Sequence, residues 1–300
     1  MGIVKSVKGL HAYAIIVIAS VAWGTFGVFA KLSYNYGIFA EALIASILLI
    51  NFATLGFALA IFDRSALRIQ KTDLPLFLIL GIFAVALQIT SYLYAVNFTT
   101  VTVATILFYT YPVFVALTAG FLFKEKITSS QWIAIFLTLF GVALVVKAYD
   151  SASLSVNLVG IFFGLLASLL FVLYFMLTRK LRHKYESRTL NLYSNGIGAL
   201  AFLPILFLPA TRIAEFPLQL ELLIFAAAMI SFLIPSLLYS YALKYVEASK
   251  GGILSVLEPL SAATLSAILL GERLESLQMV GIALALVGVV LIFQMKRKHN

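Results

Sequence analysis

The sequence of 300 residues contains no cysteine and little charge. Without cysteine the chain forms no disulfide, carries no thiol nucleophile and has no thiolate metal site. Only 11% of the residues are charged, whereas 63% are hydrophobic. Soluble globular domains have about 25% charged and about 45–50% apolar residues. The composition therefore excludes a soluble enzyme, a nucleic-acid-binding domain and a disordered protein, and it favours a protein with several membrane spans.

Residues that carry catalysis or bind metal are missing from the places where they would act. The three histidines, His11, His183 and His299, lie at the ends of apolar runs rather than inside them. The sequence has no phosphate-binding glycine loop, so we expect no direct use of ATP. No metal motif and no Ser-His-Asp arrangement falls within an apolar run. We therefore predict that the chain is not an enzyme and needs no metal or other cofactor.

The charged residues that are present divide the chain at intervals of one membrane-spanning helix. A helix rises about 1.5 Å per residue, so about 20 apolar residues cross a hydrocarbon core of about 30 Å. The unbroken length of the apolar runs favours helices over barrel strands of about ten residues. Ten spans are predicted, within segments 11–31, 41–63, 73–124 (two spans), 126–147, 150–179, 188–212, 221–244, 250–272 and 275–296.

The positions of Lys and Arg predict the orientation of these spans. If the N-terminus is cytoplasmic and ten spans alternate, 17 of the 21 Lys and Arg residues lie on the cytoplasmic side and 4 on the other. Cytoplasmic loops carry such an excess. We therefore expect both termini in the cytoplasm, and we attribute the net charge of +9 to topology rather than to a nucleic-acid partner. Lys31 and Glu41 lie at the outer ends of the first two spans, where they could pair, and an exposed pair of this kind contributes little.

The two halves of the chain are similar to each other. With an offset of 147 positions, residues 92–146 align with 239–293 without a gap, and 17 of the 55 pairs are identical. The identical pairs include Tyr92/Tyr239, Pro112/Pro259, Glu125/Glu272 and Gly141/Gly288. A unit of five spans is odd, so the second copy enters the membrane from the opposite side. We predict an all-α membrane protein of ten transmembrane helices in two inverted five-helix repeats, 1–150 and 151–300, as in alternating-access transporters.

Several short motifs carry a family resemblance. They are Ala22-Trp23-Gly24 in the first span, the segments 109–114 and 255–260 around the paired prolines, and the acidic loops 124–126 and 271–273. In these motifs, and over essentially its whole length, the chain resembles the EamA-type carriers of the drug/metabolite transporter superfamily. The resemblance implies that helices one, three, four, six, eight and nine surround a central cavity, with helices five and ten peripheral. It leaves the substrate open, because the superfamily carries amino acids, nucleotide sugars, sugar phosphates and drugs.

Glu258 is the one ionisable residue that lies near the centre of a predicted span. A charge there costs about 2.5–3.5 kcal/mol on insertion scales, so we expect Glu258 to face the bundle interior. It shares a helical stripe of small, partly polar residues with Gly251, Ser255 and Ala262. Two interpretations stay open. Glu258 binds a substrate amine or carries a coupled proton, or it is a neutral structural acid beside a broken helix.

Polar and aromatic residues near the centres of other spans are candidates for the substrate path. These candidates are Trp23, Gln88, Tyr92 and Tyr111. An indole N–H or a hydroxyl at that depth needs a hydrogen-bond partner. Gln88 and Tyr92 are four residues apart and therefore share one helix face. Tyr239, in contrast, is interpreted as a residue of the aromatic belt at the cytoplasmic interface.

Proline and glycine predict how the helices bend and pack. Pro112 and Pro259 occupy equivalent positions, and each removes one helical hydrogen bond and frees the carbonyl four residues earlier. We expect kinks at both prolines that shape the cavity and assist gating. Gly160, Gly164 and Ser168 lie four residues apart on one face, which predicts a close contact with another helix.

From the sequence alone, we predict that the chain is a secondary carrier of the inner or plasma membrane. Amino acids or related aromatic metabolites are the first choice of substrate, and export is the expected direction. Lys and Arg are missing from the midplane, which disfavours phosphorylated substrates. An exporter of cationic amphiphilic drugs is the alternative within transport, and a non-transporting membrane scaffold or partner protein is the alternative outside it. The expected partners are the small-molecule substrate, the lipid bilayer, a coupling proton and a second copy of the chain in a homodimer.

Overall fold

The computed structural model describes the backbone of residues 2–122, 129–208, 216–243, 245–246, 251 and 254–295. This part of the chain consists of helices joined by turns and contains no strand. A helix satisfies its backbone N–H and C=O groups within one segment, as a lipid environment requires. The prediction of an all-α protein is therefore confirmed.

The helices follow one another closely along the chain. The first half holds α1 (Gly2–Gly24), α2 (Phe26–Tyr34), α3 (Ala40–Phe62), the 3₁₀ turns η1 (Arg64–Leu67) and η2 (Lys71–Asp73), α4 (Leu74–Gly81), the π-helix η3 (Ile82–Leu87), α5 (Gln88–Phe98), α6 (Val101–Phe108), α7 (Tyr111–Leu122) and α8 (Ser129–Val145). The second half holds α9 (Ser151–Leu181), α10 (Ser187–Leu206), α11 (Leu218–Ala228), the π-helix η5 (Met229–Leu233), α12 (Ile234–Ala242), α14 (Leu257–Leu270) and α15 (Ser276–Met295).

Six helical segments of the described chain are long and apolar enough to cross a membrane. They are His11–Tyr34, Ala40–Phe62, Lys71–Phe98, Asn157–Leu181, Ser187–Leu206 and Leu218–Ala242. The remaining predicted spans contain shorter apolar helices, Val101–Val115, Ser129–Val145, Leu257–Leu270 and Ser276–Leu291. Large apolar side chains also point outward, and Phe57, Phe136 and Ile268 are 72%, 65% and 72% exposed. An apolar outer surface of this kind fits contact with lipid rather than water.

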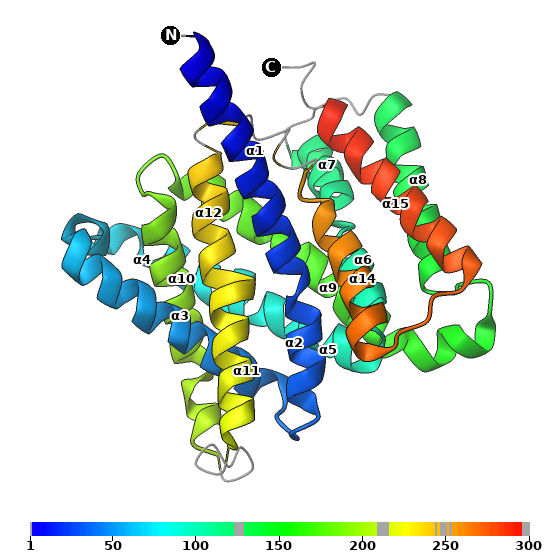
Figure 1. The fold of residues 1–300 in the computed structure, drawn as a ribbon, viewed down its shortest axis with the longest axis horizontal. Coiled ribbons are helices and arrows are strands. Elements are labelled where there is room, and N and C mark those ends of the chain that lie inside the picture. Colours follow the sequence, from blue (N-terminus) through cyan, green and yellow to red (C-terminus); the bar gives the residue numbers. More distant parts are fainter. Residues whose placement is uncertain are drawn as a thin grey trace.

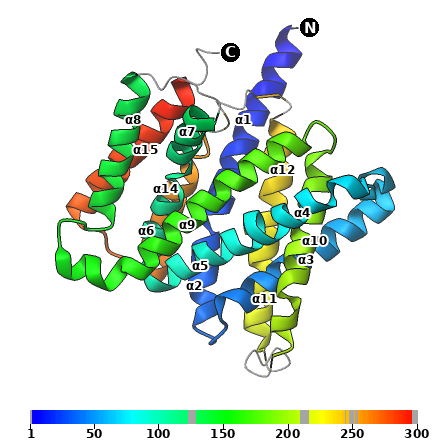
Figure 2. The ribbon, with the colours of Figure 1, turned by 180° about the vertical axis from the view of Figure 1, so that it is seen from behind.

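Helices that are distant in sequence pair at the two edges of the bundle. α8 and α15 lie side by side at one edge, and α3 and α10 lie together at the other (Figure 1). The view from behind shows the same two pairs, with α1, α9, α12 and α14 between them (Figure 2). α1 begins and α15 ends at the same end of the molecule (Figure 1). α8 and α15 approach closely, because a Cβ at Gly141 would lie 2.5 Å from the carbonyl oxygen of Gly281.

Small residues let α9 pack closely against α5 and α6. A Cβ at Gly164 would lie 2.8 Å from the Cβ of Leu107, and a Cβ at Gly160 would collide with Thr99. One turn further along α9, the Ser168 hydroxyl lies 2.9 Å from the hydroxyl of Thr110. The close contact predicted from these small residues is confirmed.

Several helices are interrupted near the centre of the bundle. α1 gives way to α2 at Thr25, α6 gives way to α7 at 109–110, and a turn at 255–256 precedes α14. The π-helices η3 and η5 begin at Ile82 and Met229, which differ by 147 positions. That difference equals the offset that aligns the two halves of the sequence. Breaks and π segments of this kind are frequent at functional sites.

At both predicted kinks a short turn interrupts the regular helix. Pro112 is the second residue of α7, and Pro259 is the third residue of α14. The missing N–H of proline costs little there, because N–H groups in the first turn have no helical partner. Tighter hydrogen bonds carry the chain through each turn, from the Thr110 N–H to the Leu107 carbonyl oxygen at 3.1 Å and from the Glu258 N–H to the Ser255 carbonyl oxygen at 3.0 Å.

Candidate functional site

A single tyrosine hydroxyl joins two of the helix breaks. The Tyr109 hydroxyl lies 2.6 Å from the carbonyl oxygen of Ser255 and 2.9 Å from Oε2 of Glu258. Tyr109 lies in the break between α6 and α7, and Ser255 lies in the turn before α14. The Tyr109 side chain is 3% exposed, so these contacts are shielded from solvent. The carboxyl of Glu258 is thus held where the two interrupted helices meet.

Aromatic rings lie beside this carboxyl. The ring centroids of Trp23 and Tyr239 are 5.0 Å apart, and the Ser255 hydroxyl lies 3.4 Å from the Tyr239 hydroxyl. The ring centroids of Tyr109 and Tyr111 are 5.7 Å apart. We refer to Trp23, Tyr109, Tyr111, Tyr239, Ser255 and Glu258 as the central cluster. Trp23, Tyr111, Tyr239 and Glu258 are partly accessible within it, as residues that contact a ligand must be.

The charge of Glu258 is surrounded by neutral hydroxyls. Four phenols interact electrostatically with it, those of Tyr92, Tyr109, Tyr111 and Tyr239. Within the described residues, the Glu258 carboxyl has no recorded Lys, Arg or His partner. Lys244, Lys250 and Glu125 lie outside the described residues. The described part of the chain also holds no group of three acidic, His or Cys side chains that would bind a metal ion.

The structure brings Trp23, Tyr111 and Glu258 together, whereas Tyr92 lies one ring further out. The Tyr92 hydroxyl lies 2.9 Å from the hydroxyl of Thr105, and its ring contacts Phe108 at 6.1 Å between centroids. Tyr92 is therefore linked to the central cluster through Phe108. Gln88 is buried at the start of α5, directly after η3, and the described structure records no hydrogen bond between its side chain and the cluster.

Tyr239, which the sequence analysis assigned to the aromatic belt, faces other helices of the bundle. It contacts Trp23 and Ser255, because α12 packs along α1 and turns this tyrosine inward. Tyr109 is a site residue that the sequence analysis missed. The internal repeat contains a signal for Tyr239, since the 147-residue offset pairs it with Tyr92. It contains none for Tyr109, which the same offset pairs with Val256.

The pair of Lys31 and Glu41 does not form. The Lys31 ammonium group lies 3.4 Å from the carbonyl oxygen of Thr99. The Glu41 carboxylate instead accepts a hydrogen bond from the Tyr94 hydroxyl. Both residues lie at the helix ends, as the sequence indicates, but the packing of α5 between them gives each a different partner.

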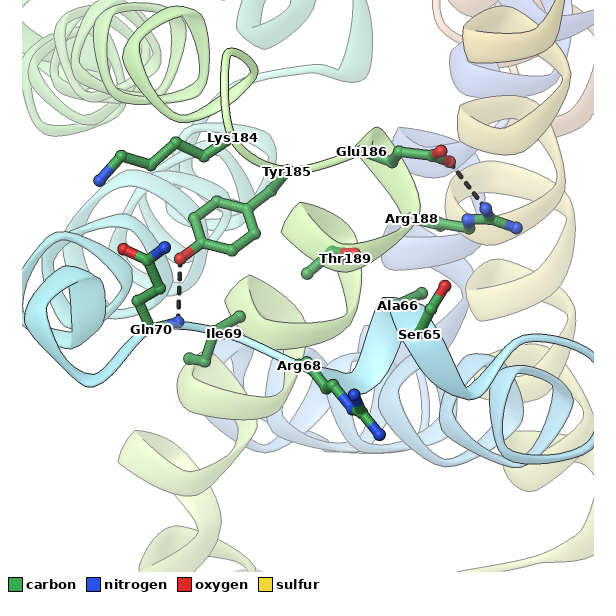
Figure 3. A pocket seen from close by; sticks show the side chains of 10 residues that line it. All are labelled: Ser65, Ala66, Arg68, Ile69, Gln70, Lys184, Tyr185, Glu186, Arg188 and Thr189. Carbon is green, nitrogen blue, oxygen red and sulfur yellow. Dashed lines mark hydrogen bonds and ion pairs between the residues drawn. The ribbon is translucent and has the colours of Figure 1, made fainter.

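A cavity of about 360 Å³ lies at the turns between α3 and α4 and between α9 and α10 (Figure 3). There the Tyr185 hydroxyl accepts a hydrogen bond of 3.0 Å from the backbone N–H of Gln70 (Figure 3). Ion pairs connect Lys184 to Asp73 at 3.0 Å and Arg188 to Asp63 at 2.6 Å. These ion pairs connect the two turns. Because positive and negative charges compensate each other here, the cavity lacks the electrostatic field of one sign that an ion-binding site has.

Comparisons with known proteins agree over nearly the whole chain. Residues 10–147 and 158–294 each match the EamA-like transporter family. An uncharacterized transporter of Archaeoglobus fulgidus is 30% identical over 281 residues, which cover 94% of this chain and 96% of that protein. The uncharacterized inner membrane transporter YicL of Salmonella typhimurium is 26% identical over 284 residues, covering 92% and 93%. One solved crystal structure matches with a TM-score of 0.67 at 17% identity, over 97% of this chain and 99% of that one, a likeness of fold alone.

Proposed function

Because this chain belongs to the EamA-like transporter family, and is thus a multi-pass membrane protein, we propose that it is a secondary active transporter of a small organic metabolite. Membership of a transporter family agrees with the expectation that the chain is not an enzyme. The observation that carries the proposal is the contact of Tyr109 with Ser255 and Glu258. Secondary transporters commonly bind their substrate where interrupted helices meet.

The proposed mechanism is alternating access between two inverted repeats of five helices, residues 1–150 and 151–300. Three relationships support the repeat. The two matched segments cover one half of the chain each, the π-helices start 147 positions apart, and Pro112 and Pro259 follow breaks at equivalent places. The edge pairs α3 with α10 and α8 with α15 also bring equivalent helices together. Rocking of one repeat against the other would open the central cluster to each side in turn.

The proposed substrates are amino acids or aromatic metabolites. We assign Trp23, Gln88, Tyr92, Tyr111 and Glu258 to substrate binding. Aromatic faces and one carboxyl suit a ligand that carries an apolar ring and an amino group. We assign Pro112 and Pro259 to gating, because each begins a half-helix beside the central cluster.

Cationic amphiphilic drugs are the second class of substrate that this site suits. The contact of Trp23 with Tyr239 lies next to the only carboxyl of the central cluster. A cation over such rings gains about 0.5–2 kcal/mol in addition to its pairing with the carboxylate. Cationic amphiphilic drugs are larger than amino acids. The size of the compounds that the protein transports therefore distinguishes the two substrate classes.

Orientation, direction and assembly complete the proposal. We place both termini in the cytoplasm of the inner or plasma membrane, on the Lys and Arg distribution, and the relative YicL carries an inner-membrane description. We further propose that the protein exports its substrate, that transport is coupled to a proton at Glu258, and that the protein assembles as a homodimer. Light scattering in detergent measures the assembly, since a monomer has a protein mass of 32.8 kDa.

Counterflow in proteoliposomes tests the proposal. Vesicles are loaded with a mixed amino-acid pool, trace labelled amino acids are added outside, and the pH gradient is varied. Transient accumulation of one label is the expected result, because an exchanging carrier couples its influx to the efflux of the pool. Accumulation should be lost in Glu258→Gln but kept in Glu221→Gln, an exposed acid at the start of α11.

Other results would contradict the proposal in different ways. Steady leak without saturation would indicate a channel. Folded protein that neither accumulates a label nor gains thermal stability from any probe would favour the membrane scaffold, because a ligand of the folded state raises Tm. Accumulation of bulky amphiphilic cations alone would select the second substrate class.

A further inference from the structure

The N-terminal turn of α6 is completed by a residue from the other half of the chain. Thr100 caps this helix locally, because its hydroxyl oxygen accepts a hydrogen bond of 3.1 Å from the Val103 N–H. The N–H groups of Val101 and Thr102 have no helical acceptor, since the first N–H groups of a helix lack one. The Glu272 carboxylate accepts hydrogen bonds from both, at 2.8 and 3.4 Å. A helix of the first half thus depends on the second half for these two bonds.

A glycine directs Glu272 towards this turn. α14 ends at Leu270, and Gly271 follows with a φ of 68°, in the left-handed region that favours glycine. The Gly271 N–H donates to the carbonyl oxygen of Ser266, so the chain turns back directly after the helix. α14 and α6 lie side by side (Figure 1). The turn at Gly271 consequently places Glu272 within reach of the start of α6.

The contact of Glu272 with α6 is surrounded by buried polar groups. The Thr102 hydroxyl lies 3.1 Å from Oε2 of Glu272 and 3.1 Å from the hydroxyl of Ser266. Thr102 and Ser266 are 1% and 0% exposed, so this contact excludes water. The Lys31 ammonium group, which attracts Glu272, lies 3.4 Å from the carbonyl oxygen of Thr99. We refer to Lys31, Thr102, Ser266 and Glu272 as the outer clamp.

The outer clamp lies between the central cluster and one end of the molecule. α6 is eight residues long and Tyr109 follows it directly, so the clamp lies about 12 Å from Tyr109 along this helix. On α14, Glu258, Ala262 and Ser266 are four residues apart and share one face. Ala262, between the carboxyl and the clamp, is 1% exposed. In the proposed orientation this is the non-cytoplasmic end, because the turns that carry the clamp follow an odd number of predicted spans.

The hydrogen bonds of the outer clamp suit a contact that opens and closes. An N–H or hydroxyl that loses its protein partner binds water instead once the two halves separate, so the net gain from each bond is small. A helix cap shifts an equilibrium by about twofold to thirtyfold. Conformations of one protein that are both populated differ by a similar amount. The contact is therefore strong enough to favour the closed arrangement and weak enough to be released.

We propose that Glu272 is the latch of a gate on the non-cytoplasmic side. While Glu272 holds the start of α6, the central cluster is closed from that side, and release of this contact opens it. The inference rests on the proposed transport function and adds to it the residue that controls access from one side. The hydrogen bonds of Glu272 go to Val101 and Thr102, so Glu272 acts on access to the site and not on binding of the substrate.

Labelling of a single cysteine in the central cluster tests the latch. The chain has no cysteine of its own, so Ser255→Cys supplies one reactive position. A small, membrane-impermeant methanethiosulfonate is applied to intact cells, which expose the non-cytoplasmic side, and to inside-out vesicles. Adding Glu272→Ala should raise the labelling rate in cells by about twofold to thirtyfold and should not raise it in the vesicles. Glu272→Gln should raise it less, because an amide oxygen still accepts a hydrogen bond.

Glu275→Ala is the matched control. Glu275 follows Glu272 closely and also joins the two halves, through an ion pair of 2.6 Å with Lys147. It lies directly before α15, which pairs with α8 at the edge of the bundle (Figure 1). The labelling rate should therefore stay unchanged in this variant. An unchanged rate in Glu272→Ala, an equal rise in Glu275→Ala, or a rise in both cells and vesicles would overturn the proposal.

A reversible cross-link tests the gate in the opposite direction. Thr102→Cys combined with Ser266→Cys replaces two hydroxyls that lie 3.1 Å apart, within reach of a disulfide. Oxidation of this double variant in proteoliposomes should stop counterflow and reduction should restore it, whereas the oxidant should not affect either single variant. Failure of the two cysteines to cross-link, or counterflow through the cross-linked protein, would overturn the gate.

The two assays separate this inference from the proposed function, because labelling does not require transport. A faster labelling rate in cells with Glu272→Ala, without counterflow of any label, would support the gate and count against transport. Counterflow by the wild type, together with an unchanged labelling rate in Glu272→Ala, would support transport and overturn the gate.

Discussion

The carboxylate of Glu272 caps the helix that begins at Val101, which lies 171 residues earlier in the chain. Its Oε1 accepts a hydrogen bond of 2.8 Å from the Val101 N–H, and its Oε2 accepts one of 3.1 Å from the Thr102 hydroxyl. The first N–H groups of a helix lack helical partners and carry partial positive charge, so a carboxylate there is favourable. One half of the chain thus completes a helix of the other half.

Loss of this cap should destabilise the protein. We expect Glu272→Ala to lower the free energy of unfolding by about 0.5–2 kcal/mol, the usual range for a helix cap. Glu272→Gln should lose less, because an amide oxygen still accepts from the Val101 N–H. Unfolding of the detergent-solubilised protein in a denaturant series measures both. Equal stability of Glu272→Ala and the control Glu221→Ala would refute the prediction.

Gly24 determines how closely α1 approaches α14. A Cβ at this position would lie 2.7 Å from the carbonyl oxygen of Glu258 and would collide with the Ser261 hydroxyl. We expect Gly24→Ala to cost about 1–3 kcal/mol, as overpacking usually does, and to impair transport by displacing Glu258. Thermal unfolding and counterflow measure the two effects. The control is Gly56→Ala in α3, where a Cβ meets only Leu192 Cδ1 at 3.5 Å, and a similar loss in both variants would contradict the explanation.

Asp63 should contribute to stability in a pH-dependent way. The hydrogen bond from the Ser65 hydroxyl and the nearby Arg188 guanidinium lower the pKa of Asp63 below its ordinary value. A carboxyl whose folded pKa is lowered contributes fully above its unfolded pKa, about 3.9, and loses the contribution as the pH falls through the folded pKa. The Tm difference between wild type and Asp63→Asn should therefore be constant from pH 7 to about pH 5 and shrink below about pH 4. A difference that grows in acid would have the wrong sign.

Topology is testable because the chain has no cysteine of its own. In Asn300→Cys, a membrane-impermeant maleimide should fail to label intact cells and should label inside-out vesicles. The physical reason is the excess of Lys and Arg on the segments assigned to the cytoplasm. Labelling of intact cells would place the C-terminus outside and reverse the predicted orientation.

Composition and spacing predict much of the architecture, because they act within one helix. Apolar runs, charges at their ends and small residues four apart depend on neighbours along the chain, and the contact of Gly164 with Leu107 follows the expected face. The interruptions before Pro112 and Pro259 also have a local cause, because proline lacks the N–H that a continuous helix needs. The position of a proline in the sequence indicates where the helix is interrupted. It does not indicate which donor binds the carbonyl oxygen that is left without its helical N–H.

Contacts between helices depend on packing, which no local pattern contains. From its sequence position, Lys31 could pair with Glu41, yet it contacts Thr99. Tyr239 was expected at the membrane interface, yet it packs against Trp23. In both cases the residue lies on the predicted helix, and the neighbouring helix decides its partner.

The sequence by itself determined a helical membrane protein with an internal repeat and a carboxyl at Glu258 that has to be compensated. Only the tertiary structure decided that Tyr109 meets both Glu258 and Ser255, across 149 and 146 residues. Hydropathy and helical periodicity reach about four residues along the chain. Which donor on another helix reaches a buried acceptor depends on which helix faces pack together. That packing is established only when the bundle assembles.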